Sequence, residues 1–140
     1  MTLTEQALLG VLAFVLLASG LLIIWVATAT ASGRMGRNAL AGIRIASTLA
    51  SDEAWLAAHR RAKRPTILAG LLLMVGALLV LAPMALEALT VSAMAVGVIA
   101  ACVLVLACGI YSAVVGSAAA RAATEAAADG KAREVSGPSS

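Results

Sequence analysis

The chain has 140 residues, of which 62% are hydrophobic and 12% are charged, and its formal net charge is +3 at pH 7. This apolar content lies well above the roughly 45–50% of soluble domains, which excludes a soluble globular core. A nucleic-acid-binding protein is not expected either, because aromatic residues make up only 3% of this basic chain.

Three stretches contain no charged residue: 6–33, 65–86 and 88–120. Each is longer than the roughly 20 apolar residues that a helix needs to cross a bilayer. Their apolar pattern is continuous rather than alternating, which excludes membrane-spanning strands. We therefore predict an all-α fold: an integral membrane three-helix bundle within residues 1–120, with spans at about 7–31, 66–86 and 89–116.

The first span has one alternative interpretation. Ala27, Ala29 and Ala31 lie in a stretch that resembles the small-residue cleavage site of a signal peptide. However, no positively charged segment precedes it, and the apolar part at residues 7–26 is longer than the 7 to 15 residues of a typical signal peptide. We expect a membrane anchor.

All ten lysines and arginines lie in two segments, residues 34–64 and 121–133. The segment before the first span has only Glu5 as a charged residue, and the turn between the second and third spans has only Glu87. Short loops rich in lysine and arginine stay on the cytoplasmic side. We expect the N-terminus outside and the C-terminus inside, with residues 32–65 forming a cytoplasmic loop.

The second half of this loop has the signals of a helix. Ser51 is a suitable N-cap, the next two residues are acidic, cations gather toward the other end, and Pro65 is expected to end the helix. The preceding residues, 37–50, predict a weaker short helix that Gly42 loosens. The sequence thus predicts a helical loop.

Trp55, Ala58, His59 and Ala62 fall on one stripe of the predicted helix. A tryptophan beside a basic cytoplasmic segment suits the headgroup level of a membrane. We therefore expect the helix to lie along the inner interface, with anionic membrane lipids as partners of its cations.

The sequence gives little support for catalysis. The charge-free spans hold no paired carboxylates, and the chain has no phosphate-binding or nucleotide-binding glycine motif. His59 is the single histidine, whereas a zinc site needs about four ligands. We expect no enzyme, no cofactor and no metal, and we expect His59 to be hydrogen-bonded to a carbonyl group or a lipid.

The third span contains a repeat of small residues every four positions. Such a stripe lets another helix approach closely, either inside the three-helix unit, which we favour, or in a homo-oligomer or a larger assembly. Beyond it we expect the helix to continue to about Ala128 and to fray at Gly130, within a flexible cytoplasmic tail at residues 121–140. The stripe consists of Ala93, Gly97, Ala101, Val105, Gly109, Ala113 and Ser117.

The loop carries a spaced motif between two spans. The motif residues are Asn38, Gly42, Ile43, Arg44, Thr48, Leu49, Ser51, Asp52, Glu53, Ala54, Trp55, His59 and Arg60. The motif resembles the signature of the SdpI family of small bacterial membrane proteins, and with the flanking helices it covers about the central half of the chain. Family members commonly have threonine where this chain has Ile45, and often glycine where it has Lys63.

The resemblance implies a multi-pass protein of the bacterial plasma (inner) membrane. The name-giving member is longer, protects its producer from a secreted toxic peptide, and helps to relay the toxin's presence to a cytosolic repressor. We expect this chain to act by binding a peptide or a membrane protein, in immunity or signalling. The alternative is a non-catalytic accessory subunit of an envelope or respiratory complex. The expected binding residues are Asn38, Gly42, Arg44, Thr48, Trp55, His59 and Arg60.

Overall fold

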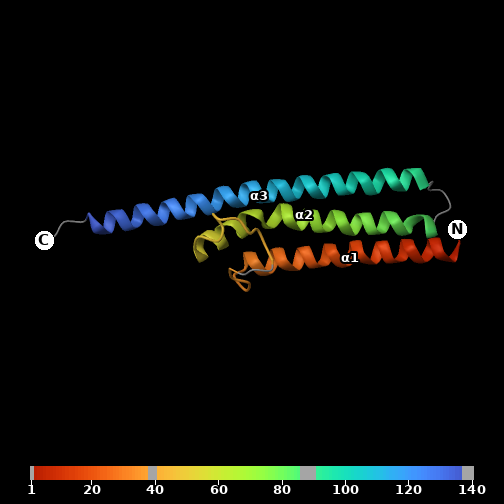
Figure 1. Ribbon diagram of the computed structural model, residues 1–140, viewed down its shortest axis with the longest axis horizontal. Helices are drawn as coiled ribbons and strands as arrows, with labels where there is room; N and C mark the ends of the chain where they lie inside the picture. Colours follow the sequence, from red (N-terminus) through yellow and green to blue (C-terminus); the bar gives the residue numbers. More distant parts are fainter. Residues whose placement is uncertain (1, 38–40, 86–90, 137–140) are drawn as a thin grey trace. The chain divides into compact units, whose positions relative to one another are not determined.

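The computed structural model describes residues 2–37, 41–85 and 91–136. Within these ranges the chain forms three helices and no strand: α1 (Leu3–Ala31), α2 (Asp52–Ala85) and α3 (Val91–Val135) (Figure 1). All three are long and apolar enough to cross a membrane. The predicted all-α, three-helix membrane fold is confirmed.

Local signals explain where α1 begins. The Thr2 hydroxyl accepts a hydrogen bond from the Glu5 backbone N–H at 3.2 Å, and the Glu5 carboxylate accepts one from the Thr2 N–H at 2.8 Å. This reciprocal capping satisfies two backbone donors that a helix start leaves without a partner. From Leu3 the helix then runs without interruption through the apolar stretch to Ala31.

The predicted end of a separate loop helix at Pro65 is wrong, because α2 is continuous from Asp52 to Ala85. Proline removes one backbone donor, which leaves the carbonyl group of Arg61 without its helical partner, but it does not force the helix to stop. Residues 52–64 carry all the charged side chains of α2, and the part from Pro65 onward has none.

The predicted end of α3 near Ala128 is also wrong, because the helix continues through Gly130 to Val135. A glycine costs a helix interior about 1 kcal/mol relative to alanine. The alanine-rich flanks have high helix propensity, and Arg133 in the last turn favours the negative end of the helix dipole. These contributions offset the cost of Gly130.

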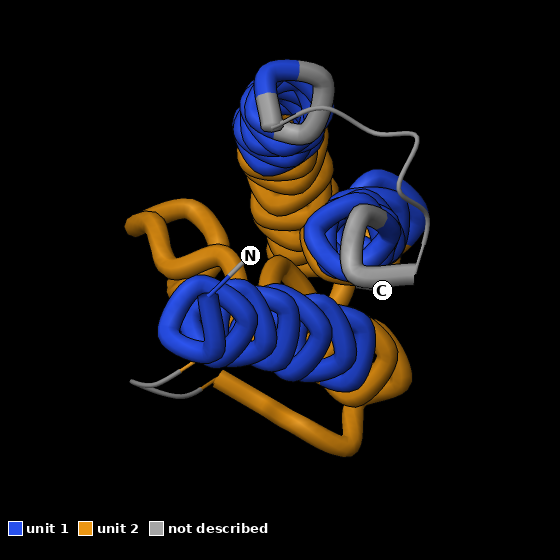
Figure 2. The backbone as a smooth tube through the Cα atoms, turned by 90° about the vertical axis from the view of Figure 1, so that its right-hand side faces the viewer, with its two compact units in different colours: residues 1–25, 64–111 blue, residues 26–63, 112–140 orange. Residues whose placement is uncertain are grey.

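The chain divides into two compact units (Figure 2). Unit 1 comprises residues 1–25 and 64–111, and therefore holds one segment of each helix. Unit 2 comprises residues 26–63 and 112–140, and holds the loop between α1 and α2 together with the remaining helix segments. Each of the three helices thus contributes to both units.

Unit 1 packs α1 against α2 through glycine. A Cβ atom built on Gly20 would lie 2.6 Å from the carbonyl oxygen of Gly70, and one built on Gly70 would lie 2.8 Å from the carbonyl oxygen of Gly20. The two backbones are therefore in direct contact at this crossing. Small residues permit such an approach. In lipid no hydrophobic force drives helices together, so their association depends on close van der Waals packing of this kind.

Elsewhere in unit 1 the buried cluster is apolar, and many large exposed side chains are apolar too. Its buried cluster contains Ala13, Ala77 and Val80, with Val98 of α3 packed against it. Large apolar side chains such as Phe14 are exposed on the outer surface. In water such a surface is unfavourable, whereas a lipid environment accommodates it. An apolar interior together with exposed apolar side chains fits a membrane bundle.

Candidate functional site

The motif loop starts with a glycine-dependent helix end. Gly33 has a left-handed φ of 77°, and its N–H donates to the Thr30 carbonyl group at 3.2 Å. The Met35 N–H donates to the Ala29 carbonyl group at 3.1 Å. This C-cap satisfies carbonyl groups that the last turn of α1 leaves without partners, and it turns the chain into the loop.

The predicted short helix over residues 37–50 is wrong, because the described part of this segment consists of turns and bends. Thr48 explains the difference. Its buried hydroxyl donates to the Ile43 carbonyl group at 2.7 Å and accepts from the Ile45 N–H at 3.2 Å. A threonine side chain that binds nearby backbone groups in this way offers the chain an alternative to the helix.

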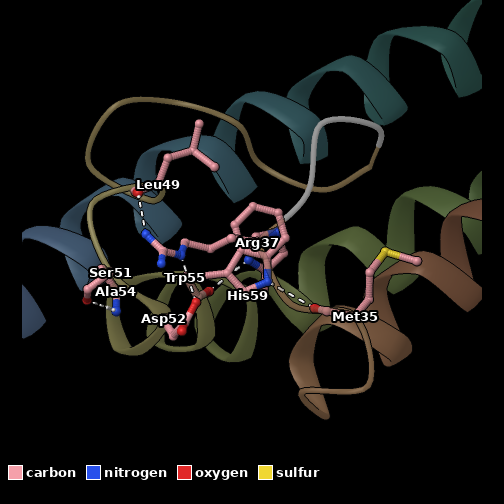
Figure 3. Close-up of polar contacts among 8 residues, drawn as sticks. All are labelled: Met35, Arg37, Leu49, Ser51, Asp52, Ala54, Trp55 and His59. Carbon is pink, nitrogen blue, oxygen red and sulfur yellow. Dashed lines mark hydrogen bonds and ion pairs between the residues drawn. The ribbon is translucent and has the colours of Figure 1, made fainter.

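The start of α2 agrees with the sequence. The Ser51 hydroxyl accepts a hydrogen bond from the Ala54 N–H at 3.0 Å, which confirms the predicted N-cap. Arg37 reaches the same end of the helix: its Nε donates to Asp52 at 2.7 Å and its guanidinium also donates to the Leu49 carbonyl group at 3.1 Å (Figure 3). Sequence reasoning did not identify this pair.

Trp55 is 2% exposed and lies inside unit 2, so the expectation that it faces lipid headgroups is wrong. Its Nε1–H donates to the Met35 carbonyl group at 3.1 Å, which ties the first turn of the loop to α2 (Figure 3). Its indole ring also packs against the His59 ring, with 4.1 Å between ring centroids. The predicted stripe of Trp55, Ala58, His59 and Ala62 is the buried face of this helix segment.

His59 connects α2 to the loop through both ring nitrogens. The Ile43 N–H donates to Nε2 at 2.9 Å, so Nε2 must carry a lone pair. The proton therefore resides on Nδ1, which donates to the Trp55 carbonyl group at 2.8 Å. The expected hydrogen bond to a carbonyl group is confirmed, and the ring is held as a neutral imidazole in one tautomer.

Burial lowers the pKa of His59 below its ordinary value of 6.5, and the hydrogen bond to the Trp55 carbonyl group raises it by a smaller amount. Both effects follow from the surroundings of the ring. Only 4% of the residue is exposed, which disfavours the charged form, whereas a carbonyl acceptor favours it. Desolvation is the larger of the two.

Gly42 brings its backbone directly onto these two rings. Its φ is 100°, which L side chains rarely adopt. A Cβ atom at this position would lie 2.5 Å from Nε2 of His59 and 3.0 Å from the Trp55 ring. Both the conformation and the space require glycine, so four of the motif residues, Gly42, Thr48, Trp55 and His59, form one connected structure.

The two motif arginines differ from those four residues. Arg44 and Arg60 are exposed, and within the described part of the chain neither side chain forms a hydrogen bond or an ion pair. In the sequence, Arg44 directly follows Ile43 and Arg60 directly follows His59, and these two preceding residues are hydrogen-bonded to each other. Asn38, the remaining predicted binding residue, lies outside the described residues.

The small residues that pack α3 in unit 2 are not those of the predicted stripe. A Cβ atom on Gly116 would lie 2.8 Å from the Ile43 side chain and 3.4 Å from the Ala58 carbonyl oxygen. Ala120 forms a buried cluster with Ala54 and Ala58. Together with the buried Ser112, Gly116 and Ala120 make a second four-residue repeat that sequence reasoning missed.

The predicted stripe changes face along α3. In unit 1, Gly97 approaches Leu79 and Ala101 approaches Gly76 of α2, whereas Gly109 has no heavy atom within 4 Å of its built Cβ. Ala113 is exposed, and the side chain of Ala93 lies outside the described part. A four-residue step turns a helix by about 40° more than one full turn, so such a stripe cannot stay on one face for its whole length.

Comparison with known proteins supports the family resemblance of the chain. The family model of the SdpI/YfhL protein family matches residues 34–115, which include the loop, α2 and most of the apolar part of α3. No curated protein and no solved structure matches the chain. The matched region covers more than half of the chain and contains the spaced motif, and the chain belongs to the SdpI/YfhL family.

Proposed function

We propose that this protein acts by binding, and that the motif loop of unit 2 presents the binding residues, in toxin immunity or membrane signalling. The observation that carries the proposal is the division among the motif residues. Gly42, Thr48, Trp55 and His59 contact one another or the loop backbone. Arg44 and Arg60 remain exposed, and their side chains make no hydrogen bond or ion pair within the described chain.

A solvated charged side chain without an internal role is available to a partner. Arginine suits this use because its guanidinium offers five donors in a fixed planar arrangement. The partner of Arg44 and Arg60 would accordingly carry acidic groups, either on a peptide or on a neighbouring membrane protein. Anionic headgroups would be the partners of the cations nearer the membrane, Arg61 and Arg64.

The distribution of charge supports an orientation for this binding surface. All ten lysines and arginines fall on the loop side of the spans or in the C-terminal segment. By the positive-inside rule, we place the N-terminus outside and the loop and C-terminus in the cytoplasm of a bacterial plasma membrane. The motif loop would then meet a partner at the inner face of that membrane.

The direct test replaces one arginine at a time in the full chain. Arg44→Gln and Arg60→Gln should each lower protection against a secreted toxic peptide, or recovery of a co-purified partner, by about tenfold, as expected for a lost charged contact. Lys131→Gln is the matched control, since it removes an exposed cation near the C-terminal end of α3, outside the motif loop. Wild-type behaviour of both arginine variants would refute the proposal.

A second candidate is a non-catalytic accessory subunit of an envelope or respiratory complex, or a homo-oligomer. The open space at Gly109 and the exposed Ala113 favour this candidate, because they leave small residues of α3 available to another helix. Purification in mild detergent distinguishes the two. Stoichiometric recovery with a large complex, abolished by Gly109→Leu but retained in Arg44→Gln, would select the accessory subunit.

A further inference from the structure

The hydrogen bond between Ile43 and His59 depends on the protonation state of the imidazole. We propose that His59 is a proton-operated latch that holds the turn at residues 42–48 on α2 and holds it less tightly at mildly acidic pH. The consequence for partner binding rests on the proposed function, because the turn carries Arg44. The latch itself is a property of the fold.

The geometry makes the neutral ring obligatory. Nε2 accepts the Ile43 N–H at 2.9 Å, and Nδ1 is committed to the Trp55 carbonyl group at 2.8 Å. Protonation adds a hydrogen to Nε2, so that both ring nitrogens carry one. The new N–H then points at the Ile43 backbone N–H, which cannot accept a hydrogen bond. An imidazolium has donors only, so the Ile43 bond cannot survive in the charged state.

A single hydrogen bond and the packing of Gly42 on the Trp55 and His59 rings hold the turn on the helix. Within residues 42–48, the Ile43–His59 bond is the one hydrogen bond that reaches α2 in the described structure. The bonds of Thr48 to Ile43 and Ile45 close the turn on itself. The turn therefore keeps its own hydrogen bonds when the Ile43–His59 bond opens.

No described neighbour stabilises a charged His59. On α2 the flanking Arg60 is a cation, and the acidic Asp52 is already paired with Arg37 at 2.7 Å. The loop contributes the cation Arg44, the adjoining end of α1 has no charged side chain, and the α3 segment presents Gly116 and Ala120. The other charged groups of the surrounding segments, all exposed, are Arg34, Glu53, Arg61, Lys63 and Arg121.

The direction of the pH effect follows from linkage. Burial lowers the pKa of His59 in the closed form, while in the open form the ring regains an ordinary pKa of about 6.5. The open form therefore binds more protons, and the closed form loses stability as the pH falls from 6.5 toward the lowered pKa. Above pH 6.5 the latch contributes its full stability.

The test uses the full chain in detergent micelles without any partner. Nitrogen-15 NMR of the His59 side chain should show the Nδ1–H tautomer at pH 8 and a pKa below 6.5. Hydrogen exchange of the Ile43 amide, corrected for the intrinsic pH dependence of exchange, should show the opening equilibrium rising severalfold between pH 8 and pH 5.5. The ordinary histidine pKa sets an upper limit of roughly tenfold.

His59→Gln is the control, because the glutamine carbonyl oxygen can accept the Ile43 N–H but does not titrate. Its corrected exchange should be equal at both pH values. A wild-type His59 that titrates at or above 6.5, or an Ile43 opening equilibrium that does not change with pH, overturns the latch even if the glutamine variant fails to fold. Arg44→Gln should keep the pH response, so its loss of partner binding would bear on the proposed function alone.

Discussion

Unit 1 and unit 2 are built from the same three helices but are held together by different interactions. Unit 1 buries small and aliphatic residues, among them Ala13, Gly20, Ala77 and Val80. Unit 2 buries polar groups as well, including Thr30, Thr48 and His59, and satisfies them with backbone partners. Close packing of small and aliphatic side chains stabilises the first unit, whereas side chain–backbone hydrogen bonds determine the conformation of the second.

The largest expected effect lies in unit 2, at Gly42. Gly42→Ala forces an alanine into a φ of 100° and places its Cβ against His59 and Trp55. The strain and overpacking should cost about 3 kcal/mol of unfolding free energy, measured by denaturant titration of the full chain in micelles. Gly36→Ala in the same loop meets no atom within 4 Å and should change it by less than about 0.5 kcal/mol. Equal effects would contradict the ring contact.

A somewhat smaller effect is expected in unit 1, at the glycine crossing. Gly20→Ala places a Cβ against the Gly70 carbonyl oxygen, so α1 and α2 must move apart at a cost of about 2 kcal/mol. Gly10→Ala, on the same helix with open space around it, is the matched control. Hydrogen exchange should show the Gly20 variant loosening unit 1 while unit 2 keeps its protection. Equal destabilisation by both variants would mean that the crossing is not a close contact.

Trp55 separates the polar contribution to unit 2 from the apolar one. Trp55→Phe keeps an aromatic ring beside His59 but leaves the Met35 carbonyl group without its donor, which should cost about 1.5 kcal/mol. Tyr111→Phe removes a polar group from an exposed aromatic residue and serves as the control, with no change expected in the same denaturant titration. Wild-type stability of the Trp55 variant would show that the indole N–H is not part of the framework.

The smallest effect is expected for the ion pair at the edge of unit 2. Arg37 and Asp52 have side-chain exposures of 41% and 77%, so solvent screens their attraction. A double-mutant cycle with Arg37→Gln and Asp52→Asn should give a coupling energy of about 0.5 kcal/mol. A coupling above about 2 kcal/mol would mean that this pair, rather than the buried rings, holds the loop to α2.

The difference between the units also explains what the sequence could predict. Continuous apolar stretches and the Ser51 cap are local signals, and they located all three helices and the start of α2. Pro65 and Gly130 misled because their unfavourable local preferences are outweighed along a long helix. Local preference thus decided where helices occur but not where they end.

The interior of unit 2 depends on pairs that are distant in sequence. Ile43 and His59 are 16 residues apart, and Met35 and Trp55 are 20 apart. No periodic pattern indicates which backbone group a buried histidine or tryptophan will meet. The motif spacing selected candidate residues through the family resemblance, but it did not separate the buried members from the exposed Arg44 and Arg60.

Amide hydrogen exchange at three consecutive residues tests the division of the motif most directly. At pH 8, Ile43 and Ile45 should be protected, since their N–H groups donate to the His59 ring and the Thr48 hydroxyl, while Arg44 between them should exchange rapidly. In His59→Ala, protection should fall at Ile43 and persist at Ile45. Equal exchange at all three positions in the wild-type protein would contradict this account, in which the buried His59 and Thr48 side chains hold the loop and Arg44 takes no part in holding it.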